Sequence, residues 1–241
     1  MTPEEIVSCI DLTSLNSADT DSSIRSLCEK SKNALGHVAA VCCYPQFLKV
    51  ARASLPEEVL LATVINFPRG DVPFLDVIAE AKSAIAEGAD ELDLVVPYRS
   101  ILLGDLSTSI ETTEAVKACC ADKTLKVIIE TGELKDTGLI FRLSLELLAH
   151  GADFIKTSTG KTQVGATEEA VNAILRALQQ YHLKTDDLKG LKVSGGIKTL
   201  QAAKLYMNLA EEYFGETYLK PATFRIGASS LLDEVLRLQI P

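Results

Sequence analysis

The chain has 241 residues, with 24 lysines and arginines against 33 aspartates and glutamates, so its net charge is −9. This acidic balance argues against a nucleic-acid partner, because nucleic acids are bound by basic surfaces that displace counterions. No apolar run approaches the roughly 18 residues of a membrane span, and the N-terminal residues lack the basic and apolar segments of a signal peptide. We therefore expect a cytoplasmic globular protein whose partner is neither a membrane nor a nucleic acid.

Cysteine and histidine usage argues against a disulfide framework and against a protein-bound metal. The six cysteines lie in the first half of the chain, and none forms a Cys-x-x-Cys motif. The three histidines are scattered and form no His-Glu-x-x-His motif. Zinc sites need ligands at short, defined spacings, so we expect reduced thiols and no metal site.

Short apolar runs rich in β-branched residues alternate with longer amphipathic segments along the whole chain. Because these runs show little polar alternation, they are typical of strands buried on both faces of a parallel sheet. The predicted strands are Cys9–Leu12, His37–Cys42, Leu60–Asn66, Glu91–Val96, Leu125–Glu130, Asp153–Lys156, Leu191–Ser194 and Phe224–Gly227.

The amphipathic segments between these strands predict helices. Thr167 is expected to cap one of them, because two glutamates follow it and suit the first turn of a helix. The matching phrases Glu87–Asp90 and His150–Asp153, both containing Gly-Ala-Asp, predict a glycine that ends a helix and leads directly into a strand. The predicted helices are Thr20–Ala34, Phe74–Ala86, Ser107–Cys120, Asp136–His150, Thr167–Tyr181 and Thr199–Phe214.

The repeating unit of one strand and one helix spans roughly 30 residues. This alternation fits either a closed (β/α)8 barrel or an open, doubly wound sheet. Eight strands at near-equal spacing in a chain of this length favour the barrel. A dinucleotide-binding sheet is disfavoured, because no Gly-x-Gly-x-x-Gly follows the first strand. The sequence therefore predicts the α/β class, a (β/α)8 TIM barrel with residues 1–241 in a single domain.

Two lysines stand at matching places on adjacent predicted strands. In a barrel, functional side chains gather at the carboxyl ends of the strands, and Lys156 and Lys192 both lie there. Burial and a neighbouring cation each favour a neutral, nucleophilic amine. A structural ion pair for each lysine is the alternative, but two like charges at one level are unfavourable in a purely structural role. We therefore interpret Lys156 as a candidate nucleophile.

Acidic and thiol side chains also occur inside the predicted strands. Asp93 and Asp11 are candidates either for proton transfer or for counter-ions of the two lysines. Lys126 and Glu130 are four residues apart on one predicted strand, so we expect them to share a face and to form an inert ion pair. Cys42 has no histidine in its own loop, so we interpret it as part of a pocket wall rather than as a nucleophile.

Three loops that follow adjacent strands predict a site for an anion. Glycines let backbone N–H groups approach an anion, and the loops after the seventh and eighth strands bind phosphate in many barrels. The loop after the eighth strand also opens the last helix, whose first N–H groups lack partners. The residues of this predicted site are Thr159, Gly160, Lys161, Gly195, Gly196, Gly227, Ser229 and Ser230.

The segment from Val127 to Leu134, followed by the segment from Gly151 to Lys161, closely resembles the deoxyribose-phosphate aldolase family. Shorter matches continue the resemblance in the same order from about residue 9 to residue 232. They are Ile10–Thr13, Ala62–Pro68, Gly88–Asp93, Lys192–Gly196 and Arg225–Ser230. The resemblance implies a class I aldolase on a (β/α)8 barrel that needs neither a metal nor another cofactor. It also implies interconversion of 2-deoxy-D-ribose 5-phosphate with D-glyceraldehyde 3-phosphate and acetaldehyde.

The resemblance also implies roles for individual residues. Carried over by motif, Lys156 is the lysine that forms the Schiff base, Lys192 lowers its pKa, and Asp93 belongs to the proton relay. Asp11 and Thr13 match positions that line the pocket near the sugar hydroxyls, and the three loops above match the phosphate-binding set. The implied partners are a phosphosugar and aldehydes, and a homodimer is an expected assembly because members of the family are often dimers.

The sequence departs from the family pattern at three places. Lys198 stands where many members have arginine, which keeps the charge but loses the two-pronged hydrogen bonding of a guanidinium. Val193 and Ser194 replace a proline-alanine pair. Some members also continue into a tail that ends in tyrosine, whereas this sequence ends at Pro241, so we expect that role to be either absent or filled by water. Two alternatives stay open: a Schiff-base lyase with a different aldehyde donor, and a barrel that binds a phosphosugar without cleaving it.

Overall fold

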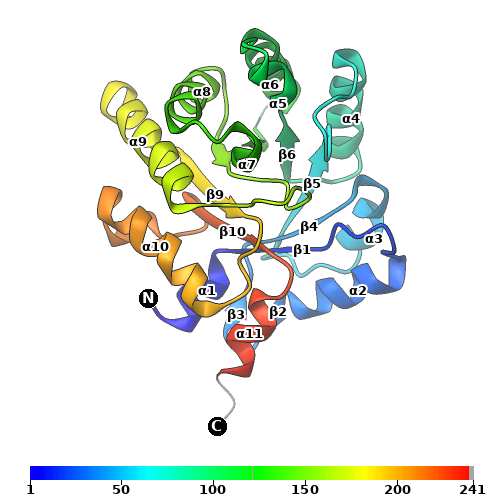
Figure 1. Ribbon diagram of the computed structural model, residues 1–241. Helices are drawn as coiled ribbons and strands as arrows, with labels where there is room; N and C mark the ends of the chain where they lie inside the picture. The colour runs from blue at the N-terminus through cyan, green and yellow to red at the C-terminus, as the bar shows by residue number, and fades with distance from the viewer. Residues whose placement is uncertain (121, 239–241) are drawn as a thin grey trace.

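Eight parallel strands close into a barrel, and helices surround it on the outside (Figure 1). The computed structural model describes residues 1–120 and 122–238, so Pro241 and the end of the predicted 1–241 domain lie outside the described residues. The strand order around the barrel is β1-β10-β9-β8-β7-β6-β5-β4, which confirms the predicted (β/α)8 class over an open sheet. The barrel strands are β1 (Ile10–Thr13), β4 (Ala40–Cys43), β5 (Leu60–Ile65), β6 (Glu91–Val95), β7 (Thr124–Ile128), β8 (Phe154–Lys156), β9 (Gly190–Ser194) and β10 (Phe224–Ala228).

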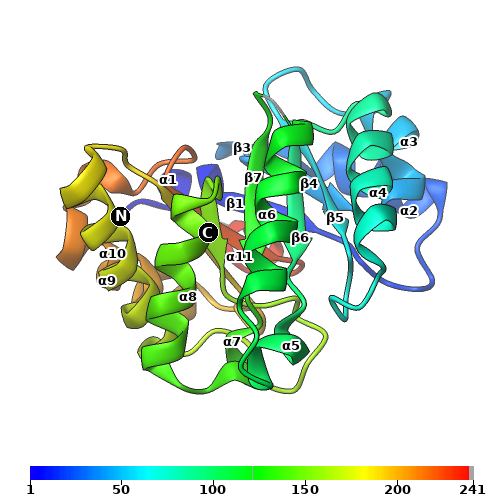
Figure 2. The same ribbon diagram turned by 90° about the horizontal axis from the view of Figure 1, so that it is seen from above.

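The helices stand outside the barrel strands, as the view in Figure 2 also shows. A small antiparallel hairpin of β2 (Lys32–Asn33) and β3 (Gly36–His37) lies beside the barrel, and Pro45–Phe47 and Glu216–Tyr218 form short 3-10 turns. The helices are α1 (Pro3–Ser8), α2 (Asp21–Lys30), α3 (Leu48–Arg52), α4 (Phe74–Ala86), α5 (Tyr98–Leu102), α6 (Ser107–Cys120), α7 (Thr131–Leu134), α8 (Thr137–Ala149), α9 (Glu168–Thr185), α10 (Leu200–Phe214) and α11 (Leu231–Arg237).

The longer helices begin where their capping residues predict. The hydroxyl of Thr167 accepts a hydrogen bond from the N–H of Ala170, which confirms the predicted start of α9. Asp136 caps α8 in the same way, because its carboxylate accepts from Leu139. Each side chain satisfies a backbone donor that the first helical turn leaves without a partner.

Two predicted strands are shorter than expected because the backbone turns sharply at their ends. The predicted strands Leu60–Asn66 and Leu125–Glu130 end at Ile65 and Ile128 instead. Asn66 has φ 54° and Glu130 has φ 50°, and this left-handed conformation is incompatible with a pleated strand.

The region between the first two barrel strands also differs from its prediction. The helix expected over Thr20–Ala34 ends at Lys30, and the strand expected from His37 begins at Ala40. The β2–β3 hairpin occupies the residues between them. The short helices α1, α3, α5 and α7 were not predicted, because four to six residues are too few to show a helical period.

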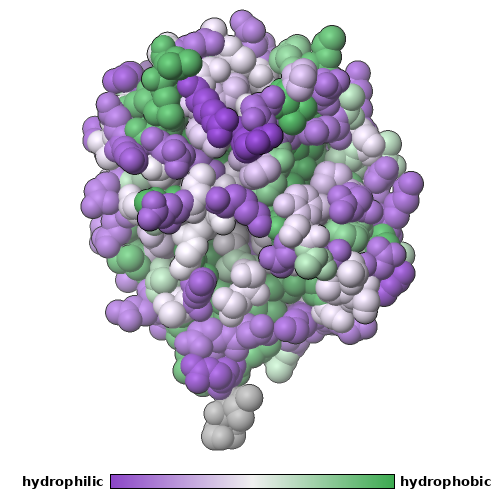
Figure 3. Space-filling model, turned by 45° about the vertical axis from the view of Figure 1, so that its right-hand side comes forward, coloured by the Kyte–Doolittle hydropathy of each residue, from purple (hydrophilic) through white to green (hydrophobic). Residues whose placement is uncertain are grey.

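The barrel wall separates an apolar outer layer from a polar interior. Ile155 of β8 belongs to the large core between strands and helices, whereas its neighbour Lys156 faces the interior, as the alternation of a strand requires. On the molecular face of Figure 3, hydrophilic side chains and small apolar patches are interspersed. Within the described residues, no helix has the length and apolar character needed to span a membrane.

Candidate active site

A cavity of about 270 Å³ opens at the carboxyl ends of β1, β8, β9 and β10. This is the end of the barrel at which the sequence predicts the functional residues. The predicted residues that line the cavity are Thr13, Lys156, Thr159, Gly160, Lys161, Gly195, Gly196, Gly227 and Ser229.

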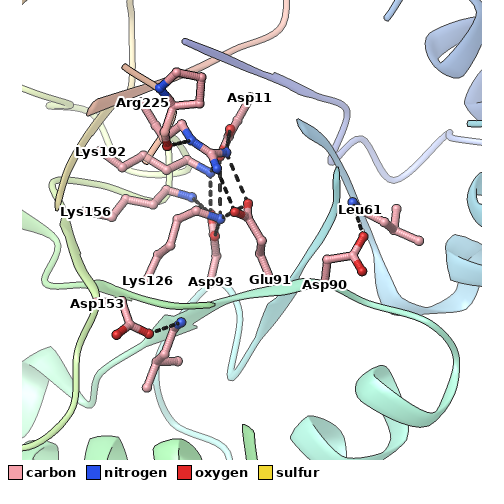
Figure 4. A network of polar contacts seen from close by, with 12 residues as sticks. Asp11, Leu61, Asp90, Glu91, Asp93, Lys126, Asp153, Lys156, Lys192 and Arg225 are labelled. Atoms are coloured by element: carbon pink, nitrogen blue, oxygen red, sulfur yellow. Dashed lines mark hydrogen bonds and ion pairs between the residues drawn. The ribbon is translucent and has the colours of Figure 1, made fainter. Parts of the chain in front are cut away.

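Asp93 lies beneath this cavity at the centre of three lysines (Figure 4). The ammonium groups of Lys156 and Lys192 donate to the same oxygen, Oδ2, at 2.6 and 2.7 Å. Lys126 donates to the other oxygen, Oδ1, at 3.1 Å. Since β6, β7, β8 and β9 are neighbours in the barrel, their inward side chains converge on this one carboxylate.

Arg225 and two further acids extend the network deeper into the barrel. The Arg225 guanidinium donates to Asp11 at 2.5 Å and to Glu91 at 2.7 Å. Glu91 also accepts from Lys126 at 2.5 Å, and Lys192 lies 2.5 Å from an oxygen of Asp11. Every side chain of this network is at most 4% exposed.

The charges of this buried network favour a neutral Lys156. Four basic groups face three carboxylates, so full ionisation would leave one positive charge without a counter-ion. Burial, opposed by Asp93 and assisted by the Lys192 cation, lowers the pKa of Lys156 below its ordinary value. Burial also disfavours the charged form of Lys192, but Asp11 and Asp93 outweigh it and raise the pKa of Lys192. The arrangement therefore favours loss of a proton from Lys156, while Lys192 stays a cation.

The two aspartates remain ionised inside the barrel. Burial alone would raise the pKa of Asp93, but Lys126, Lys156 and Lys192 together hold it well below the ordinary value. Lys192, Arg225 and Lys126 lower the pKa of Asp11 in the same way. Asp11 does not line the cavity as the family resemblance implied, because its carboxylate is fully buried and paired with Arg225 and Lys192. It is a counter-ion of the network.

Two further predicted residues lie outside the cavity lining. Cys42 is buried in a small apolar cluster with Leu15, Ala40, Ala62 and Val64, inside the barrel. Burial raises the pKa of the Cys42 thiol to about 11, so the thiol is protonated at neutral pH and is a weak nucleophile. Ser230 occupies the position just before α11.

The predicted ion pair between Lys126 and Glu130 does not form. Their separation of four residues implies a shared face only if the strand continues, but β7 ends at Ile128 and Glu130 is left-handed. Lys126 instead pairs with Glu91 and Asp93, whereas Glu130 accepts hydrogen bonds from the loop after β8.

The cavity mouth is formed by glycines and lysines. Gly195 and Gly196 follow β9 with φ values of 90° and 87°, a conformation that suits glycine and turns the backbone toward the cavity. The ammonium of Lys161 reaches across the mouth and donates to the carbonyl of Leu15 at 2.5 Å. Lys198 lines the same cavity, is exposed, and has no ion pair with any described residue.

Sequence reasoning missed several lining residues and two of the seven charged side chains of the network, Glu91 and Arg225. Lys198 lies two residues after the Gly-Gly turn, and Arg225 interrupts an apolar strand, so both positions carried a signal. Glu91 carried the same signal as Asp93, two residues away on one face. The other lining residues not predicted are Leu15, Asn16, Ser194, Ile197 and Ala228. Within residues 1–120 and 122–238, no group of three His, Cys, Asp or Glu side chains is arranged to hold a metal ion.

Fold and site together define a (β/α)8 barrel with a buried lysine that lines a cavity at the carboxyl ends of the strands. Comparison with known proteins identifies the family. A model of the DeoC/LacD family aldolases matches residues 6–234, and the chain belongs to this family. A deoxyribose-phosphate aldolase from Agrobacterium fabrum is 46% identical over 235 residues, which cover 96% of this chain and 89% of the relative.

Solved structures agree with this assignment. A putative deoxyribose-phosphate aldolase from Coccidioides immitis superposes with a TM-score of 0.85 at 29% identity, covering 100% of this chain and 88% of that one. A deoxyribose phosphate aldolase from Aeropyrum pernix, described as a tetramer, gives a TM-score of 0.78 at 26% identity over 98% of this chain and 91% of that one. A putative aldolase from Toxoplasma gondii shares the fold, with a TM-score of 0.87 at 23% identity over 98% of this chain and 92% of that one.

Proposed function

We propose that this aldolase reversibly cleaves 2-deoxy-D-ribose 5-phosphate into D-glyceraldehyde 3-phosphate and acetaldehyde, in the catabolism of deoxyribonucleosides. The observation that carries the proposal is the position of Lys156. Its amine lines the cavity, while the rest of the charged network lies below. The specificity for this substrate is supported by the 46% identical deoxyribose-phosphate aldolase.

Lys156 begins the reaction as a nucleophile. Its neutral amine adds to the C1 aldehyde of the open-chain sugar, and loss of water leaves an iminium ion. The hydroxyl on C3 is β to this group, so loss of its proton breaks the C2–C3 bond. The bonding electrons move to C2 and delocalise onto the lysine nitrogen as an enamine. The three-carbon aldehyde phosphate then departs.

Asp93 and Lys192 support the proton transfers that follow cleavage of the C2–C3 bond. The enamine takes a proton at C2 and becomes the iminium of acetaldehyde, which water hydrolyses to acetaldehyde and free Lys156. Asp93, 2.6 Å from the Lys156 nitrogen, stabilises each cationic intermediate and accepts or returns protons through water. Burial and the Lys192 cation both lower the pKa of the free amine, which favours its neutral form between turnovers. Because the lysine nitrogen is the electron sink, the reaction needs no further cofactor.

The phosphate group of the substrate lies at the glycine-rich mouth in this proposal. Gly160, Gly195, Gly196 and Ser229 line the cavity there, beside the exposed Lys198. A dianion bound at this end is held away from Lys156, so its binding free energy positions the aldehyde carbon without taking part in bond cleavage.

Borohydride trapping tests the proposed function. The protein is incubated with 2-deoxyribose 5-phosphate and sodium borohydride, and its peptides are then analysed by mass spectrometry. A reduced adduct on Lys156 is expected, and the Lys156→Ala variant is expected to give none while keeping its fold. An adduct on another lysine, or turnover by Lys156→Ala, contradicts the proposal.

The same experiment separates the two alternatives. A Schiff-base lyase with a different donor forms the Lys156 adduct with other aldehydes more readily than with acetaldehyde. A barrel that only binds phosphosugars shows saturable binding of 2-deoxyribose 5-phosphate and no adduct.

A further inference from the structure

Glu130 combines two features that the proposed reaction does not use. It follows β7 directly with φ 50° and ψ 62°, a left-handed conformation that is uncommon for a residue with a side chain. It is also fully buried, and burial raises the pKa of its carboxyl group above the ordinary value. Strained backbone and a buried acid both cost free energy, so the surrounding structure must hold this residue in place.

The contacts of Glu130 all lead to the loop that follows β8. Its Oε2 accepts a hydrogen bond from the Thr159 hydroxyl at 2.5 Å, and both carboxylate oxygens lie 3.3 Å from the Thr159 N–H. Its Oε1 accepts from the Thr162 hydroxyl at 3.2 Å. The Thr159 hydroxyl in turn accepts from the N–H of Lys161 at 3.0 Å. One carboxylate therefore fixes both ends of a four-residue turn at the cavity mouth.

The rest of this loop is held by close backbone contacts. A Cβ at Gly132, two residues after Glu130, would lie 2.2 Å from the carbonyl oxygen of Val164. A Cβ at Gly165 would lie 2.2 Å from the carbonyl oxygen of Gly195. The loop is thus in direct contact with α7 on one side and with the Gly-Gly turn of β9 on the other. A shift of the loop would change the spacing of both walls of the mouth.

We propose that Glu130 is a positioning residue that sets the enzyme's preference for a phosphorylated substrate by fixing the turn from Thr159 to Thr162 at the phosphate end of the cavity. This inference rests on the proposed function and deepens it. Glu130 is left-handed, and its carboxylate reaches from the end of β7 to the loop that follows β8. The sequence predicted a regular strand through Glu130 instead, with its side chain on the same face as Lys126.

The test compares two substrates and one anion in the Glu130→Gln variant. We expect the ratio of kcat/KM for 2-deoxyribose 5-phosphate to kcat/KM for unphosphorylated 2-deoxyribose to fall about tenfold or more, the loss typical of a hydrogen bond to a charged group. The ratio removes any effect that the lost charge has on Lys156, because both substrates use that amine. The dissociation constant of inorganic phosphate, measured by calorimetry, is expected to rise by a similar factor.

Matched variants control for structural damage. Glu133→Gln changes an exposed acid of α7, the short helix that follows Glu130, so both the ratio and phosphate binding are expected to stay as in the wild type. Thr159→Val removes the hydroxyl that links Glu130 to Lys161 and is expected to lower the ratio, whereas Thr159→Ser keeps it. This pair tests the inference even where Glu130→Gln does not fold.

The outcomes distinguish the inference from the function on which it rests. Equal losses for both substrates with unchanged phosphate binding in Glu130→Gln and Thr159→Val would overturn the positioning role. Absence of wild-type cleavage would overturn the proposed function, and the phosphate titration would still decide whether Glu130 shapes an anion site.

Discussion

At the scale of single residues, the charge state of Lys156 depends on how one carboxylate is shared between two lysines. Asp93 Oδ2 accepts from both Lys156 and Lys192, so the two ammonium groups compete for one oxygen. Lys192 has a second anion in Asp11, whereas Lys156 has none among the described residues. Lys156 is therefore the group that gives up its proton most readily.

Replacement of Lys192 tests this competition. In Lys192→Met the neighbouring cation is removed and Asp93 becomes free to stabilise protonated Lys156, so the pKa of Lys156 should rise. The acidic limb of the kcat/KM profile against pH is then expected to move upward by about 1 unit or more. Lys189→Met, at the opposite end of the barrel, is the control and should leave the limb in place. An unmoved limb in Lys192→Met would show that Lys192 does not tune the amine.

The sequence indicated three side chains that meet beneath the cavity, but not their full electrostatic setting. Lys156, Lys192 and Asp93 were identifiable because each is a charged residue in an apolar strand. The partners of Lys126 were not, because the pairing depends on which strands become neighbours around the barrel. Glu130 was misassigned for a local reason, since a left-handed residue breaks the alternation on which face assignments rest.

At the scale of elements, the Gly-Ala-Asp segment occurs twice and makes the same connection both times. We call this connection, in which the aspartate joins two neighbouring strands, the joint. Gly88 and Gly151 have φ values of 99° and 103° and follow α4 and α8. Asp90 then accepts a hydrogen bond from the N–H of Leu61 on β5, which Figure 4 shows. It also forms an ion pair with Arg52. Asp153 repeats this with the N–H of Leu125 on β7. Each aspartate joins the start of its strand to a neighbouring strand.

Because this joint lies at the amino ends of the strands, it affects stability rather than catalysis. Asp153 accepts from Lys117 at 2.6 Å and from Lys189 at 3.2 Å besides the strand N–H. Asp153→Asn is expected to lower the free energy of unfolding by about 1–3 kcal/mol, measured by urea denaturation, with kcat/KM unchanged. Asp187→Asn, which removes an exposed partner of Lys189, should cost less than about 0.5 kcal/mol. A comparable loss in both variants would contradict a special role for the joint.

Elements with their own local signals were predictable, whereas those set by packing were not. Capping residues placed the starts of α8 and α9 to within a residue, and the glycines placed the ends of α4 and α8. The β2–β3 hairpin and the four-residue α7 carry no periodic pattern, because each is too short to have one. The closure of the barrel was inferred from strand number and spacing, which constrain topology even without a single predicted contact.

At the scale of the whole molecule, the buried network links stability to pH at both ends of the scale. The folded pKa values of Asp11 and Asp93 lie below the ordinary 3.8, so their contribution is complete above pH 3.8 and is lost as the pH falls toward the folded values. The folded pKa of Lys192 lies above the ordinary 10.5, so its contribution is complete below pH 10.5 and is lost above it. Asp11, Asp93 and Lys192 therefore contribute fully between these limits, whereas Lys156, whose pKa is lowered in the folded state, opposes folding at pH values below 10.5.

Thermal unfolding across the pH range checks this expectation. The melting temperature should drop below about pH 3.8, as the two aspartates become protonated. Asp93→Asn removes the central anion, so the melting temperature of this variant should fall less at low pH than that of the wild type. If the melting temperatures of both proteins fall equally at low pH, Asp93 is not the group whose protonation destabilises the fold.

The lysines at the cavity mouth lie on a chain whose net charge is −9, and this combination affects how an anion approaches. An anionic sugar phosphate approaching this molecule is repelled by the surface as a whole and attracted by Lys161 and Lys198 at the mouth. In about 0.15 M salt the Debye length is about 8 Å, which is shorter than the width of the molecule. Distant carboxylates are therefore largely screened, and charges within about one Debye length of the mouth act most strongly on the approaching anion. An acidic protein can thus bind an anion, because salt weakens the repulsion from distant carboxylates more than the attraction to the nearby lysines.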